Sequence, residues 1–120
     1  MGYLYYGTTD RPVDIPDWVL AHVKVVATTK LRRLESFTLS WRHPEGTPRG
    51  RSTLWMHPSI PLRFVFDTAE TELLDRDYLQ KLALAAGSTN GMVIDLWQTT
   101  DAPAPTERVA ESRTDLVEAP

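Results

Sequence analysis

The residues best suited to chemistry alternate with apolar ones through positions 36–63 of the chain. The polar set combines arginines, hydroxyls, a histidine and a tryptophan: Thr38, Ser40, Arg42, Arg51, Thr53, Trp55, His57 and Arg63. Because alternate residues of a strand share one face, we expect these side chains on one face of a sheet. Proteins that bind single strands stack bases on such aromatic rings and hold phosphates with cations. The pattern predicts a nucleic-acid-binding face, in a module accessory to DNA or RNA transactions.

The tryptophan in this set also supports a second hypothesis. Aromatic residues are favoured in strands and at protein interfaces for packing alone, so Trp55 could pack under the N-terminal hairpin or against a second copy of the chain. A domain of about 100 residues buries only about 60–70% of its surface, which leaves aromatic side chains for a partner to cover. The alternative prediction is a non-catalytic homodimer, a structural or interaction protein that buries this face.

A second basic group, Lys30, Arg32 and Arg33, falls in the last turn of a predicted helix. Cations at this position stabilise the negative end of the helix dipole. Cations also neutralise the phosphates of a nucleic acid. The group is therefore a second candidate for the nucleic-acid or partner surface.

Catalytic and metal sites need residue groups that the sequence does not provide. The histidines are predicted on a helix, in a loop and at a strand end, without the short spacing of metal ligands: His22, His43 and His57. The acidic residues near a predicted helix start are favoured there by the helix dipole: Asp67, Glu70, Glu72, Asp75 and Asp77. Neither Ser59 nor Ser88 sits in a nucleophile elbow. Since the chain also lacks cysteine, we expect no catalytic residue, no cofactor and no metal.

The net charge of −3 hides a strong polarity along the chain. Residues 24–63 carry eight basic and two acidic side chains, whereas residues 98–120 carry two basic and five acidic ones. The positive charge therefore coincides with the alternating segment, and the overall charge does not exclude an anionic partner. The acidic C-terminal segment is a potential competitor for that partner.

Hydrophobic periodicity places these residues on strands and helices. Strands are predicted over residues 3–6, 13–15, 36–42, 51–57, 62–66 and 92–97. The first helix begins at Asp17 as N-cap and carries an apolar stripe to Leu34, with His22 facing water. The second begins at Asp75 as N-cap and stops at Gly87. The order ββ-α-βββ-α-β predicts a single α+β domain, an antiparallel or mixed sheet with both helices packed on one face.

The C-terminal segment differs in composition from the rest. Residues 98–120 contain Pro103, Pro105 and Pro120 and no aromatic residue. Such a segment buries too little apolar surface to offset its ordering entropy. We therefore predict a folded domain over residues 1–97 and a disordered acidic tail over residues 98–120.

The sequence shows no targeting segment. No stretch approaches the ~20 apolar residues of a membrane span. The first residues lack the basic start and the apolar run of a signal peptide. We expect a cytoplasmic protein without a membrane partner.

Four segments of the body carry a resemblance: Gly2-Tyr3-Leu4-x-Tyr6-Gly7, Val19-Leu20-Ala21-His22-x-x-Val25-Val26, Lys30-Leu31-Arg32-Arg33-x-Glu35-Ser36-Phe37 and Gly50-Arg51-x-Thr53-x-Trp55-x-His57-Pro58-Ser59-Ile60-Pro61-Leu62. Together they resemble a family of short actinobacterial proteins of uncharacterised function, which are often labelled ATP-dependent DNA ligase. The resemblance implies a shared fold over residues 1–97.

The ligase label implies a Lys-x-Asp-Gly motif, whose lysine takes the AMP. None of Lys24, Lys30 and Lys81 is followed by x-Asp-Gly. A ligase also needs an adenylation domain and usually an OB domain, which 120 residues cannot hold. The resemblance therefore supplies no catalytic residue, a ligase-related function rests on the label alone, and we do not expect an enzyme.

Overall fold

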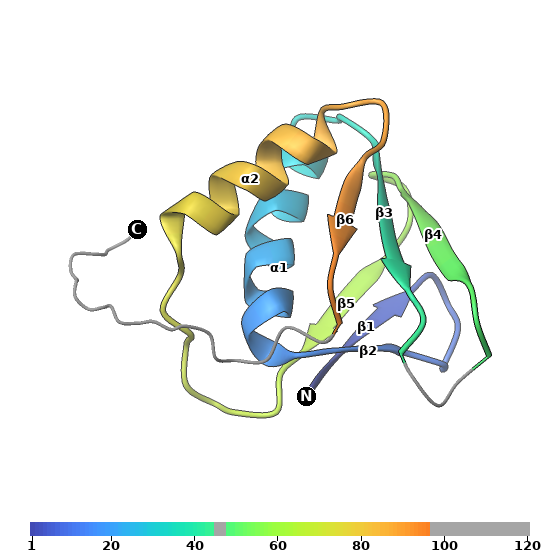
Figure 1. Ribbon diagram of the computed structural model, residues 1–120, viewed down its shortest axis with the longest axis vertical. Coiled ribbons are helices and arrows are strands. Elements are labelled where there is room, and N and C mark those ends of the chain that lie inside the picture. Colours follow the sequence, from blue (N-terminus) through green and yellow to red (C-terminus); the bar gives the residue numbers. More distant parts are fainter. Residues whose placement is uncertain (45–47, 97–120) are drawn as a thin grey trace.

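The computed structural model describes residues 1–44 and 48–96, and its elements follow the predicted order ββ-α-βββ-α-β (Figure 1). The elements are β1 (Gly2–Tyr6), β2 (Val13–Ile15), α1 (Asp17–Arg32), β3 (Phe37–Arg42), β4 (Arg51–Met56), β5 (Leu62–Val65), α2 (Arg76–Ala86) and β6 (Met92–Ile94). The predicted α+β class is confirmed. The predicted last strand ends earlier, at Ile94. Trp97 and the predicted tail over residues 98–120 lie outside the described residues.

The strands form two three-stranded sheets, where the alternation suggested one. The first has the order β2-β1-β5 and the second β4-β3-β6. All neighbouring strands are antiparallel except β3 and β6, which are parallel. Pro58 and Pro61 lie in the β4–β5 connection, and β5 pairs with β1 instead of returning along β4. The hydroxyl of Tyr6 donates to the carbonyl of Trp55, which joins the two sheets.

Both helices lie on one side of the sheets, against each other (Figure 1). The core between these layers is aliphatic, with a few larger side chains. Its largest fully buried apolar members come from both helices and both sheets: Leu4, Ile15, Leu20, Leu39, Met56, Leu82 and Met92. Burying one such side chain stabilises the fold by roughly 1.5–3 kcal/mol, so this core holds the sheets in register.

Asp17 is not the N-cap of α1. The cap position is Pro16, whose lack of an N–H costs nothing at a helix start, and Asp17 is the first helical residue. The Asp17 carboxylate accepts the backbone N–H groups of Asp67 at 3.0 Å and Thr68 at 3.3 Å. The side chain therefore anchors the segment that follows β5 to the start of α1.

After the C-terminal end of α1, a residue other than glycine adopts the left-handed backbone conformation. The N–H of Glu35 donates to the carbonyl of Lys30, and the N–H of Leu34 to that of Leu31, both at 3.0 Å. This is the hydrogen-bond pattern of a Schellman motif, which needs a left-handed residue, here Leu34 with φ 63°. Leu34 was expected on the apolar stripe, but it lies past the helix end and is 78% exposed.

Helix α2 has the predicted boundaries. The Asp75 carboxylate accepts the N–H groups of Asp77 at 2.9 Å and Tyr78 at 3.2 Å, which is N-cap geometry. Gly87 is the C-cap. Leu82 and Ala86 are buried on the face that was predicted to be apolar.

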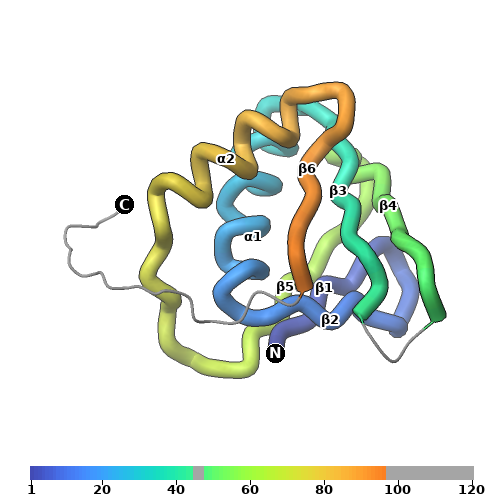
Figure 2. The backbone as a smooth tube through the Cα atoms, viewed as in Figure 1, coloured from blue at the N-terminus to red at the C-terminus, as the bar shows by residue number. Residues whose placement is uncertain are grey.

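The residue before strand β6 is a glycine, Gly91, that the neighbouring strand β3 crowds. Gly91 has φ +75°, and a β-carbon at this position would lie 1.8 Å from Oγ1 of Thr38 and 2.9 Å from its carbonyl oxygen. Only glycine meets both requirements. The close approach lets β6 pair with β3 directly after the turn that leaves α2 (Figure 2).

Candidate functional site

The solvent side of the β4-β3-β6 sheet is arranged in cross-strand rows. Thr38 faces Trp55, Ser40 lies between Thr53 and Val93, and Arg42 faces Arg51. We call this surface the outer sheet face, defined by Thr38, Ser40, Arg42, Arg51, Thr53, Trp55 and Val93. The rows place an indole at one end, hydroxyls in the middle and guanidinium groups at the other end.

Trp55 presents its ring to solvent from a backbone that is held in place. It is 54% exposed, while the next residue, Met56, is fully buried. Its carbonyl accepts the hydroxyl of Tyr6 from the other sheet. The ring is therefore an exposed aromatic surface on a rigid strand, the arrangement that stacking on a ligand requires.

The middle row is polar on one side and apolar on the other. The hydroxyls of Ser40 and Thr53 are 2.8 Å apart and hydrogen-bonded. Val93, on the other side of Ser40, is 58% exposed. A hydroxyl pair keeps donor and acceptor capacity beyond the bond that it shares, so this row can contact a sugar or a phosphate.

The third row carries the positive charge of the outer sheet face. Arg42 and Arg51 face each other across the antiparallel pair, and both are exposed. The β3–β6 pairing ends at Trp41 and Ile94, and Asp95 follows directly after Ile94. Arg51 lies on β4, which β3 separates from β6 and Asp95.

Arg63 and His57 were expected on the same face, and the structure places them elsewhere. Arg63 is on β5, in the other sheet, with its guanidinium 5.4 Å from the ring centre of Tyr5. His57 follows β4 and is half-buried; its Nδ1 accepts the backbone N–H of Ser59 at 3.1 Å and lies 2.8 Å from the Ser59 hydroxyl. One side chain therefore packs on an aromatic ring and the other shapes the turn after β4.

The basic end of α1 divides into a structural part and an exposed part. Lys30 pairs with Glu35 at 3.3 Å, in the same turn that closes the helix. Arg32 and Arg33 are exposed. The chain from Arg33 leads into β3 at the end of the sheet that carries Thr38 and Trp55, so these cations border the aromatic row.

His22 is buried, in contrast to its predicted place on the water-facing side of α1. It is fully enclosed between α1 and the start of α2. Its Nδ1 donates to the carbonyl of Trp18 at 2.7 Å, and its Nε2 accepts the N–H of Asp75 at 2.8 Å. Burial lowers the pKa of His22 from 6.5 to about 4, against opposing contributions from the Trp18 carbonyl and the Asp75 charge. The neutral ring is a structural connector between the helices.

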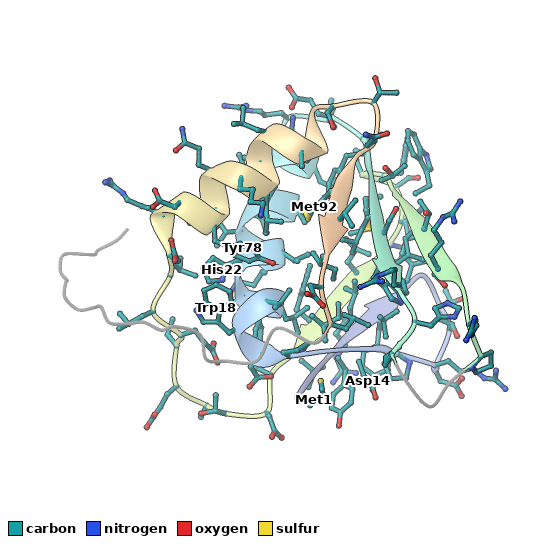
Figure 3. The ribbon with its side chains drawn as sticks, viewed as in Figure 1. Met1, Asp14, Trp18, His22, Tyr78 and Met92 are labelled. Carbon is teal, nitrogen blue, oxygen red and sulfur yellow. The ribbon has the colours of Figure 1, made fainter. Side chains whose placement is uncertain are left out.

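Two aromatic rings enclose His22 in this helix junction (Figure 3). The centre of the Trp18 ring lies 4.3 Å from that of His22, and the Tyr78 ring lies 5.0 Å from it, edge-on. Trp18 and Tyr78 stack on each other at 4.8 Å. We call Trp18, His22 and Tyr78 the helix junction; it joins α1 to α2 and leaves no imidazole nitrogen for a ligand.

A hollow of about 300 Å³ lies between α2 and β6. Its lining combines a phenol, an ammonium and a carboxylate with small and apolar residues: Tyr78, Lys81, Leu82, Ala85, Gly91, Val93 and Asp95. Burial, and then the charge of Asp95, raise the pKa of Tyr78 to about 12, so its hydroxyl keeps its proton. The sequence carries no signal for this site, because its polar groups come from two elements whose packing no local pattern reports.

Two of the other candidate groups, His43 and Asp67, have structural partners. His43 contacts the Ser52 hydroxyl at 2.7 Å through Nε2 and the Pro48 carbonyl at 3.0 Å through Nδ1. Asp67 lies 3.6 Å from the N-terminal amine. Within residues 1–44 and 48–96, no three histidine or acidic side chains are grouped to hold a metal ion. Across the same residues, no helix is long and apolar enough to cross a membrane.

Comparison with known proteins gives one match. Residues 1–96 match the family described as "Domain of unknown function (DUF7882)". No curated protein and no solved structure matches the chain. The description of the family gives neither an activity nor an organism, so function has to be argued from the site.

Proposed function

We propose that this chain, which belongs to the DUF7882 family, binds nucleic acid through the outer sheet face. The observation that carries the proposal is Trp55, an exposed indole on a rigid strand that shares its face with Arg51. Of the seven residues that define the face, two are basic, three carry hydroxyls, one is the indole of Trp55 and one, Val93, is apolar. No residue of the defined set is acidic.

The chemistry of the three rows matches the parts of a nucleotide. Stacking of one base on an aromatic side chain contributes about 1–3 kcal/mol, and every base has a face that can stack. The hydroxyls of the middle row suit sugar and phosphate oxygens, and the arginines suit phosphates. Four residues separate Trp55 from Arg51 along β4, which is about 13 Å and spans roughly four stacked nucleotides.

The decisive experiment measures fluorescence anisotropy of labelled single- and double-stranded oligonucleotides with the full chain over a salt series. Trp55→Ala should weaken binding about tenfold or more, because a base loses its stacking surface. Leu73→Ala is the matched control, since it also removes an exposed apolar side chain but lies in the segment before α2. Absence of binding at low salt, or binding that ignores salt, would overturn the proposal.

The arginines give a separate readout. Arg51→Gln should weaken binding to all sequences alike and reduce the slope of log affinity against log salt by about 0.7. Arg76→Gln is the control cation, since Arg76 begins α2, away from β4 (Figure 1). An unchanged slope in Arg51→Gln would remove this residue from the interface.

A homodimer through the same face is the second candidate function. It is favoured by exposed apolar side chains on or beside the face, namely Trp55, Val93 and Leu34. Light scattering across a dilution series distinguishes the two functions. A dimer that Trp55→Glu dissociates supports the second candidate, whereas a monomer at all concentrations removes it.

A further inference from the structure

We infer that the hollow between α2 and β6 holds a ribose of a single-stranded RNA whose base stacks at Trp55. This inference rests on the proposed function and names its substrate class. The residues that it assigns are Asp95, Lys81 and Tyr78, none of which belongs to the outer sheet face.

The hollow and the outer sheet face form one continuous surface. Val93 belongs to both, because it pairs with Ser40 in the sheet and lines the hollow. Strand β6 is the edge of the β4-β3-β6 sheet, and α2 packs beside it (Figure 2). A ligand that crosses the strands from Trp55 passes Thr38 and reaches the hollow at Gly91 after the width of the sheet, about 10 Å or roughly three stacked nucleotides. Asp95 lies four residues further along the chain, about 13 Å from this end of the hollow.

The charges of the hollow favour a hydroxyl-bearing group next to a phosphate. A phosphate alone would face the carboxylate of Asp95, and a cation alone would face the ammonium of Lys81. A ribose between two phosphates offers a hydroxyl to the carboxylate and a phosphate to the ammonium. Its 2′-hydroxyl donates to the carboxylate, as a ribose hydroxyl does to the acidic residue of dinucleotide sites, while Lys81 contacts the neighbouring phosphate.

The phenol of Tyr78 is the third polar group of the hollow, beside Asp95 and Lys81. Its ring is fixed by the stack with Trp18, so the hydroxyl side of the ring is held at the hollow. The raised pKa keeps that hydroxyl protonated, which makes it a neutral donor and acceptor. Deoxyribose lacks the 2′-hydroxyl that the carboxylate would accept, so the hollow distinguishes RNA from DNA.

The test compares oligonucleotides of identical sequence and about eight nucleotides, as RNA, DNA and 2′-O-methyl RNA, by anisotropy with the full chain. The wild-type chain should bind RNA about tenfold more tightly than DNA, with the 2′-O-methyl strand close to DNA. Asp95→Ala should remove most of this preference by weakening RNA binding. Asp77→Ala, at an exposed acidic residue in the first turn of α2, should leave the preference intact.

Lys81 gives an independent readout. Lys81→Gln should reduce the salt slope for RNA and DNA alike by about 0.7, as expected for the loss of one phosphate contact. Lys24→Gln is the control, because the Lys24 ammonium lies over the Phe66 ring, 5.6 Å from its centre. A slope unchanged by Lys81→Gln would overturn the phosphate contact in the hollow.

The outcomes separate this inference from the proposed function. If the wild-type chain binds RNA and DNA equally, or if Asp95→Ala weakens both equally, the ribose site is wrong while nucleic-acid binding stands. If no strand binds at low salt, both proposals fail. A preference for RNA that only Asp95→Ala removes supports both.

Discussion

The rings of Trp18 and Trp55 differ in how they are packed: one lies against other side chains and the other faces solvent. Trp18 belongs to the helix junction, where its ring stacks on Tyr78 and its carbonyl accepts Nδ1–H of His22. Trp55 belongs to the outer sheet face, where its carbonyl is bonded to Tyr6 but its ring stands open to solvent. Both backbones are fixed, and only one ring is covered.

The contrast separates residues that hold the fold from residues that are left to bind. In the helix junction both imidazole nitrogens of His22 have partners within the chain and the Trp18 and Tyr78 rings pack on each other, so the imidazole binds no ligand in the folded chain. On the outer sheet face the backbone is satisfied while the ring and the guanidinium groups face water. An aromatic residue held this way adds little to stability, and its exposed area is available to a partner.

The largest expected effect tests the two tryptophans against each other. Trp18→Ala should lower the free energy of unfolding by about 3 kcal/mol, because it removes the stack on Tyr78 and leaves a cavity over His22. Trp55→Ala should lower it by only about 1 kcal/mol, because more than half of the side chain is already exposed to solvent. Urea unfolding of both variants measures the difference. Equal losses would mean that the ring of Trp55 is covered in solution, as in a dimer.

The next effect is a pH dependence confined to the helix junction. The pKa of His22 is about 4 in the folded chain and 6.5 when exposed, so between these values the unfolded chain binds the extra proton. The contribution of His22 is therefore complete above about pH 6.5, falls as the pH drops toward 4, and amounts to about 3 kcal/mol. Unfolding measured at several pH values, for the wild type and for His22→Gln, isolates it by difference.

Glu72 also contributes to the pH dependence of the wild type, so the effect of His22 has to be obtained by comparison with His22→Gln. Burial, mainly, raises the pKa of its carboxyl, so the folded chain holds that proton more tightly than the unfolded chain. This contribution stabilises the fold at low pH and is lost as the pH rises, opposite in sign to that of His22. Parallel pH profiles for the wild type and His22→Gln would contradict a buried neutral imidazole.

The smallest effect concerns the acidic segment, residues 98–120, and its competition for the outer sheet face. Deleting residues 98–120 removes five acidic and two basic side chains. If this segment competes for the outer sheet face, oligonucleotide affinity should rise about threefold at low salt and converge with the wild type at high salt. Titrations of both chains at two salt concentrations measure it. An affinity that deletion leaves unchanged at low salt removes the competition.

Local signals in the sequence predicted the elements well, because their causes are local. The carboxylate of Asp75 caps α2 through groups two and three residues away, and Gly87 ends the helix within the same turn. The alternation through β3 and β4 also placed Trp55 and Arg51 on one face, since these strands pair as neighbours in sequence. The order ββ-α-βββ-α-β follows from such short-range rules.

The errors share a long-range cause. Arg63 obeys the alternation within β5, but β5 pairs with β1, far away in the sequence. Leu4 pairs with Phe64, 60 positions later, and Tyr3 pairs with Val65, 62 positions later. His22 lies opposite the main apolar stripe of α1, and the second helix covers that side as well. Asp17 looked like a cap because its real partners, the N–H groups of Asp67 and Thr68, are 50 and 51 residues away. Periodicity within one element cannot report which other element will pack against it.

Gly91 constrains how this sequence can change over time. A side chain there would meet Thr38 at 1.8 Å and would also have to adopt a φ of +75°, so no single substitution is tolerated without rebuilding the turn. Its neighbours Val93 and Asp95 are exposed and meet no such limit. Descendants of this chain are therefore expected to keep the glycine while the exposed residues of the hollow diverge. The fold would be inherited unchanged, and the choice of ligand would be the trait on which selection acts.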